Sequence, residues 1–99
     1  MADRKVWLGA VRVFDDAVIS DSKEQAVKVL EEAAEVVEAY KNTMRITNRR
    51  GVRSGMLALA AEIADVVQAA CNLAFVCGID MRAALDRCEQ RNRGRGRVS

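Results

Sequence analysis

The chain contains no histidine and no proline, and only six of its 99 residues are glycine. Without histidine, it cannot be a di-iron helical bundle of the kind that uses Glu-x-x-His motifs. Zinc is disfavoured too, because Cys71, Cys77 and Cys88 form no C-x-x-C pair, and we interpret them as reduced thiols. Alanine, valine, leucine and glutamate dominate instead and recur at spacings of three and four. This composition predicts an all-α fold.

The length predicts a single domain over residues 1–99. The periodicity predicts four helices, over 4–19, 23–42, 54–77 and 81–92. Ser22 and Gln25 fit a capping box, Asp80 fits an N-cap, and residues 93–99 are expected to be a frayed basic tail. Because so short a chain buries little of its own surface, we expect oligomerisation to complete the bundle.

The longest apolar run, from Ala58 to Cys77, is long enough to cross a membrane. It contains two acids, Glu62 and Asp65, which would be costly near the middle of a span. We therefore expect no membrane association. The first residues, MADRKVW, are charged and lack the pattern of a signal peptide, so we expect a cytoplasmic protein.

The charge is unevenly distributed along the chain. Residues 41–53 carry five basic side chains and no acid, and residues 87–99 carry five arginines and one glutamate. Subtracting these charges of +5 and +4 from the net charge of +2 leaves −7 on the rest of the chain. An acidic body with two basic segments suggests an anionic ligand that also requires a metal.

Two pairs of acids have the spacing of one helical face. Glu32 and Glu35 are three residues apart, and so are Glu62 and Asp65. In an antiparallel hairpin of the second and third predicted helices, positions whose numbers add up to 97 lie level, so the pairs should face each other. Four such carboxylates need a counter-charge, and oxygen ligands suit Mg²⁺, with Mn²⁺ as the alternative. An ordinary solvated acidic face is the simpler interpretation.

These motifs resemble those of a known family. EEAAE followed after 26 residues by EIAD is similar to the EExxE…ExxD signature of MazG-like nucleoside triphosphate pyrophosphohydrolases, within the all-α NTP pyrophosphatase superfamily. NRGR resembles an asparagine and an arginine that the family places after its fourth helix. The resemblance covers residues 5–96. It implies a MazG-like four-helix bundle that hydrolyses nucleoside triphosphates, deoxynucleotides included, between the α- and β-phosphates, yielding a nucleoside monophosphate and pyrophosphate.

The resemblance also implies residue roles, position by position. The implied magnesium ligands are Glu32, Glu35, Glu62 and Asp65. The implied catalytic carboxylates, which take a proton from water or bind a second metal, are Glu31 and Glu35. The implied phosphate contacts, within a homodimer or homotetramer, are Asn92, Arg95 and Arg91. A lysine that family members often carry before the asparagine is here Cys88, and Arg87 or Arg91 is the candidate to replace it.

Candidates for contacts with the base or ribose are Trp7, Phe14 and Asn72. Trp7 and Phe14 lie on the apolar stripe of the first predicted helix, so their alternative role is in the core. Asn72 extends the polar strip that contains Glu62 and Asp65, and its alternative role is a hydrogen bond between helices.

Two other functions remain open at this point. The segment KVLEEAAEVVEAYK is similar to the matching helix of phosphoribosyl-ATP pyrophosphatase, a member of the same superfamily. A non-catalytic helical oligomer that binds nucleic acid through RNRGRGR is the alternative from another class. That tail is short and has no interleaved aromatic residues, which argues against nucleic acid as the ligand.

Overall fold

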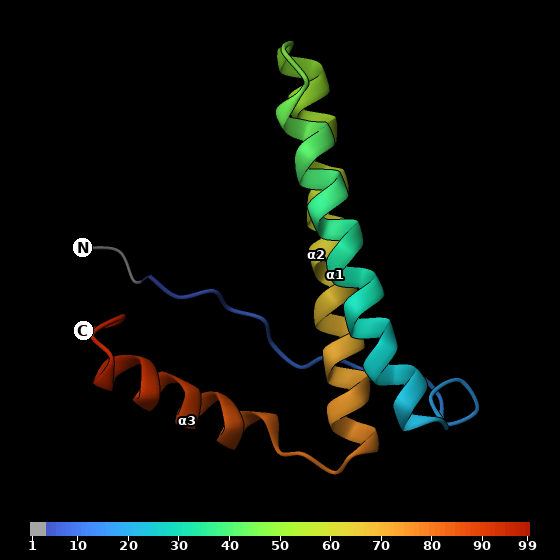
Figure 1. Cartoon of the computed structure of the whole chain (residues 1–99), viewed down its shortest axis with the longest axis vertical. Coiled ribbons are helices and arrows are strands. Elements are labelled where there is room, and N and C mark those ends of the chain that lie inside the picture. Colours follow the sequence, from blue (N-terminus) through green and yellow to red (C-terminus); the bar gives the residue numbers. More distant parts are fainter. Residues whose placement is uncertain (1–3) are drawn as a thin grey trace.

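The computed structural model describes residues 4–99, and these residues form helices and no strand. The helices are α1 (Ser22–Met44), α2 (Arg49–Val76) and α3 (Met81–Gly94). α1 and α2 pack against each other as a long antiparallel hairpin, and α3 leaves the end of α2 to one side (Figure 1). The all-α class is therefore confirmed.

Short polar side chains set the starts of the helices. The Asp21 carboxylate accepts a hydrogen bond from the Glu24 N–H at 3.2 Å and caps α1, so the capping box predicted for Ser22 and Gln25 is wrong. Asp80 caps α3 by accepting from the Ala83 N–H at 3.2 Å, as predicted. Gln25 therefore takes no part in the cap of α1.

The hairpin is tighter than the sequence indicated. Asn48 caps α2, accepting from the Gly51 N–H at 2.7 Å, so α2 begins at Arg49 rather than at residue 54. Much of the basic segment 41–53 is therefore helical, and the connection is only residues 45–48. The basic residues of this segment lie toward the tip of the hairpin, beyond the acidic pairs.

Glycines in the left-handed conformation end α2 and α3. Gly78 has φ 67°, and the Ile79 N–H donates to the Ala74 carbonyl at 2.8 Å, which closes α2. Gly96 has φ 72° and closes α3 in the same way, through a bond from the Arg97 N–H to the Asn92 carbonyl at 2.9 Å. Residues 93 and 94 thus belong to the helix, and the tail that was expected from residue 93 begins after them.

The helix predicted over residues 4–19 is wrong, and a single chain forms no four-helix bundle. Residues 4–15 have no regular secondary structure, Gly9 has φ 68°, and the Asp15 carbonyl accepts from Val18 and Ile19 in a turn. The backbone of this segment is bonded to α2 instead, because the Phe14 N–H donates to the Asn72 Oδ1 at 3.1 Å and the Arg12 carbonyl accepts from Gln68 at 2.9 Å. Trp7 is 81% exposed, so it belongs neither to the core nor to the base-binding wall in this chain.

α2 has the length and apolar composition of a membrane span, with a mean hydropathy of 1.5 over an 18-residue stretch. Only 17% of that stretch is buried within the chain. Core helices of soluble proteins can match it in length and apolar composition but are mostly buried, and Glu62 and Asp65 interrupt this one. The expectation of a protein without membrane contact stays a prediction.

Candidate functional site

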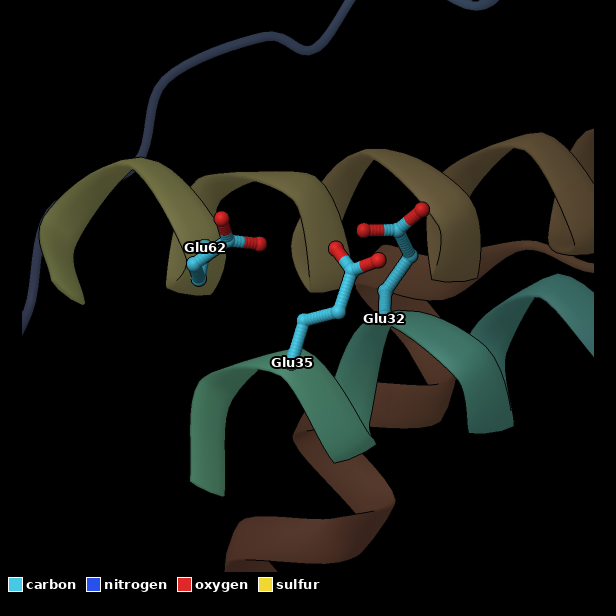
Figure 2. A group of neighbouring side chains, drawn as sticks. All are labelled: Glu32, Glu35 and Glu62. Carbon is cyan, nitrogen blue, oxygen red and sulfur yellow. The ribbon is translucent and has the colours of Figure 1, made fainter. Parts of the chain in front are cut away.

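Three carboxylates meet halfway along the hairpin. Glu32 and Glu35 extend from α1 and Glu62 from α2, and one oxygen of each lies within 4.8 Å of the others (Figure 2). The predicted register accounts for this meeting, because Glu35 and Glu62 are level across the two helices. Asp65 is close enough for its charge to act on both Glu32 and Glu62, although it is not within the same 4.8 Å group. We call these four residues the carboxylate cluster.

Two carboxyl groups of the cluster, those of Glu32 and Glu62, have a pKa above that of an isolated glutamate. Burial, followed by the charges of Glu35 and Asp65, raises the pKa of Glu32. A hydrogen bond with the Glu35 carboxyl, followed by burial, raises the pKa of Glu62. Carboxylates this close repel one another unless a cation or a proton lowers their combined charge. The site is therefore short of positive charge.

The counter-charge is not supplied by the rest of the described chain. The Oε2 atom of Glu62 is buried and has no hydrogen-bond donor among residues 4–99. The ion pairs found in the same residues, Lys28 with Glu31 and Arg93 with Glu89, both lie outside the cluster. Lys28 is the one base whose charge acts on Glu32, lowering its pKa against the larger raising effects. A buried acceptor among acids is suited to a cation.

Glu31 lies apart from the cluster. Its carboxylate pairs with the Lys28 ammonium at 3.4 Å, and about half of each side chain is exposed. One residue before Glu32 is about 100° around the helix, so Glu31 points away from the seam between α1 and α2. The structure therefore keeps Glu35 in the group but does not bring Glu31 into it.

The predicted phosphate contacts are also apart from the cluster within one chain. α3, which carries Asn92, Arg91 and Arg95, does not pack extensively on α1 or α2. The Asn92 amide donates to the Cys88 Sγ at 3.6 Å and accepts from an Arg97 guanidinium nitrogen at 3.3 Å. Cys88, at the position where members of the resembled family often carry lysine, thus contacts Asn92.

Cavities adjoin the carboxylates on two sides. One, of 260 Å³, is lined by Glu32 and Asp65 and extends toward the start of α1. The other, of 340 Å³, is lined by Glu35 and Glu62 and extends toward the hairpin connection. A ligand whose charged part lay at the cluster could therefore place the rest of itself in either cavity.

The 260 Å³ cavity includes residues that the sequence analysis had assigned differently or had missed. Phe14 and Asn72 line it, and so do Gln25, Lys28 and Gln68, while the predicted contact with a base stays a prediction. A signal for two of these was present in the sequence. Gln25 and Lys28 precede Glu32 by seven and four residues, which puts them on the same helical face.

Comparisons with protein-family profiles, with curated proteins and with solved structures find no match to this chain.

Proposed function

We propose that the protein hydrolyses nucleoside triphosphates between the α- and β-phosphates in a magnesium-dependent reaction, releasing pyrophosphate. The observation that carries this proposal is the carboxylate cluster, in which oxygens from Glu32, Glu35 and Glu62 approach within 4.8 Å of one another. The family resemblance of the two acidic motifs gives the reaction. The absence of histidine and the separation of the cysteines restrict the site to hard cations.

The residues present fit a divalent cation. The buried Glu62 Oε2 has no donor among residues 4–99, and the mutual repulsion of the neighbouring carboxylates favours a bound cation. We assign Glu32, Glu35, Glu62 and Asp65 as the ligands of Mg²⁺. When bound, such an ion neutralises charge on the phosphate oxygens and lowers the pKa of water.

Within this arrangement Glu35 is the carboxylate best placed to hold a proton taken from the attacking water. Its carboxylate lies between those of Glu32 and Glu62 (Figure 2), with one oxygen of each within 4.8 Å of the others. Glu31 is already paired with Lys28, so its contribution is to hold that lysine at the edge of the 260 Å³ cavity. The lysine adds positive charge on the side where an anionic substrate enters.

A second copy of the chain belongs to the proposal, because one copy leaves too much surface uncovered. The chain exposes 8321 Å², whereas a folded monomer of 10.9 kDa exposes about 5,600 Å². In residues 4–99 the buried apolar side chains are only Ile19, Ala69 and Ala74. Each helix exposes large apolar residues, among them Leu30, Leu57 and Leu85. The uncovered area is of the size buried by each partner in obligate dimers.

The assembly also bears on catalysis. α3 carries the arginines proposed to bind phosphate, and it does not approach the cluster of its own chain. A neighbouring copy could supply them, and Arg91, Arg95 and Asn92 are the residues assigned to that role. A homodimer or homotetramer is therefore expected to be the active form.

The test is pyrophosphate release from a panel of ribo- and deoxynucleoside triphosphates and phosphoribosyl-ATP, with and without Mg²⁺. Glu35→Gln should lower the rate by about 100-fold or more while the helical circular dichroism is kept. Glu89→Gln is the matched control, because Glu89 is an exposed acid of α3 paired with Arg93, and it should keep full activity.

Full activity of Glu35→Gln, or release that does not depend on the metal, would overturn the proposal. A preference for phosphoribosyl-ATP over every nucleoside triphosphate would assign the chain to the sister activity. Salt-sensitive binding of DNA or RNA, without any pyrophosphate release, would support the non-catalytic alternative instead.

A further inference from the structure

One side of the hairpin is apolar. In the sequence, each carboxylate of the cluster is followed directly by an apolar residue, which gives the set Ala33, Val36, Ile63 and Val66. One residue is about 100° around a helix, so this step leads from the carboxylates to another side of the seam. The four apolar residues line a cavity of 200 Å³ there. Neither of the cavities that adjoin the carboxylates includes any of them.

Large exposed side chains continue this apolar surface along both helices. On α1, Leu30, Val37 and Met44 are seven residues apart, a spacing that keeps them on one side of the helix, and each is more than half exposed. On α2, the exposed residues Val52, Met56 and Ile63 lie within about 40° of one another around the helix axis. The apolar face, as we call this surface, consists of Leu30, Ala33, Val36, Val37, Tyr40, Met44, Val52, Met56, Ile63 and Val66.

The two ends of the hairpin carry opposite charges. Residues 39–61, which form its tip, contain five basic residues and no acid. At its base, residues 15–24 have a net charge of −3, and residues 80–89, at the start of α3, have a net charge of −1. In residues 4–99, neither the basic residues of the tip nor the acids of 15–24 form an ion pair. Both ends are therefore free to pair with charges outside the chain.

The arginines of the tip oppose the electrostatic preference of the helix in which they lie. Arg49 and Arg50 are the first two residues of α2, whose first turn contains no acid. The N-terminus of a helix carries partial positive charge, so that acids stabilise it and basic residues destabilise it. A sequence that breaks a local rule in this way often does so for an interaction elsewhere. Here the arginines suit an acidic partner.

We propose that a second copy of the chain packs on the apolar face in antiparallel orientation, with the basic tip of each hairpin beside the acidic base of the other. A two-fold axis through the middle of the hairpin brings the apolar face of one copy onto that of the other. The same rotation makes residues 45–53 of one copy level with residues 15–24 of its partner, so the charges attract at both ends. A parallel pair would instead bring the two basic tips together.

The amount of uncovered surface favours a second copy over a small anion. The chain exposes 8321 Å², against about 5,600 Å² for a folded monomer of this mass, and an obligate dimer buries surface of this order. The antiparallel pair goes beyond the proposed reaction and does not depend on it. Because the cavities beside the carboxylates lie on another side of the seam, the pair leaves them open.

Charge reversal tests the orientation, with the dissociation constant of the dimer measured by sedimentation equilibrium at low salt. The tip variant Arg49→Glu with Arg50→Glu and the base variant Asp15→Lys with Asp16→Lys should each weaken the dimer about tenfold. All four substitutions in one chain should restore the wild-type constant to within about threefold, because opposite charges again meet at both ends. In a parallel pair, like charges would meet in all these proteins, so no weakening and rescue would be seen.

The helices themselves should not be harmed by the tip variant. Glutamates in the first turn of α2 favour that helix, so its weaker association cannot result from unfolding, and circular dichroism checks this. The apolar face has its own matched pair of variants. Leu30→Glu should dissociate the dimer and Leu57→Glu should not, although the two leucines are 72% and 70% exposed. Leu57 lies about 120° around α2 from Ile63 and is therefore off the face.

The distance between the two tips gives an independent measurement. A nitroxide is attached at Thr47→Cys in the full chain, with the three native cysteines replaced by alanine, and the distance is obtained by pulsed electron resonance. An antiparallel pair separates the tips by about the length of α1, roughly 33 Å from Ser22 to Met44. A parallel pair would hold them about 10–20 Å apart, one or two interhelical spacings.

A short distance between the tips, or four substitutions that fail to restore association, would overturn the antiparallel pair. So would binding of anionic lipid vesicles or of DNA that the tip variant loses while its dimer is unchanged, since the tip would then have another partner. A protein that meets the charge and distance expectations but releases no pyrophosphate would keep the pair and remove the proposed function. Magnesium-dependent release by a protein that fails them would do the reverse.

Discussion

Replacing Gly55 by alanine should force the two long helices apart. A methyl group at this position of α2 would lie 2.7 Å from the Thr43 Oγ1, 2.9 Å from its Cγ2 and 3.1 Å from its Cβ. Thr43 cannot swing aside at low cost, because it is 2% exposed and its hydroxyl donates to the Ala39 carbonyl at 2.8 Å. The contact is therefore with the fixed part of a short side chain.

Two opposing effects determine the size of the change in stability. Alanine in a helix interior is favoured over glycine by about 1 kcal/mol. Overpacking a close contact typically costs about 1–3 kcal/mol. The net expectation for Gly55→Ala is a loss of about 1 kcal/mol, which for a chain of this length lowers the melting temperature by roughly 4–8 °C.

Thermal unfolding followed by circular dichroism measures this loss at fixed protein concentration. The double variant Gly55→Ala with Thr43→Ala should recover part of it, because the smaller side chain at 43 leaves room for the methyl group. Gly94→Ala is the control, since an alanine there would meet nothing within 4 Å. If Gly55→Ala instead stabilised the protein by about 1 kcal/mol, the higher helix propensity of alanine would be the only effect acting. The close approach of α1 and α2 at Thr43 and Gly55, which sets the register of Glu35 and Glu62, would then be refuted.

Three further predictions concern charge and assembly. In the metal-free protein the raised pKa values of Glu32 and Glu62 mean that the folded state binds more protons than the unfolded state, so stability should fall as pH rises past about 4.3. Glu62→Gln should flatten that decline in melting temperature, and an unchanged slope would contradict it. Mg²⁺ at ten times its Kd should add about 1.4 kcal/mol of stability, or roughly 6–11 °C, and Glu35→Gln should abolish most of this shift; a flat magnesium titration would count against the site. Light scattering at micromolar concentration should give a dimer or larger assembly, and a monomer would contradict the assignment of the exposed apolar surface.

The acidic half of the candidate site could be predicted from residue spacing. Positions three apart share a helical face, and a hairpin with a short connection makes level positions add to a constant number. That reasoning brings Glu35 to Glu62 without any tertiary information, and the structure has them together. It did not include Glu31, whose role came from the family resemblance alone and which the structure pairs with Lys28 outside the cluster.

The amide side chains that line the 260 Å³ cavity could not be predicted in the same way. Gln25 fitted a helix cap in the sequence, and only the choice of Asp21 as the cap leaves it in the cavity. The segment before α1 has an apolar pattern that suits a helix, yet its backbone at Arg12 and Phe14 is bonded to α2 instead. The two residues joined by each bond are 56 or 58 positions apart in the sequence, and no local sequence pattern predicts such bonds.

The sequence by itself determined that the chain is helical, where α1 and α3 lie to within a few residues, and which acids share a face. Those properties depend on periodicity and capping, which act over a few residues. The tertiary structure alone decided that Phe14 and Asn72 meet, that Gln25 lines the cavity, and that α3 stands away from the carboxylates. These outcomes depend on contacts between distant segments, whose entropic cost is repaid only when the whole hairpin has formed.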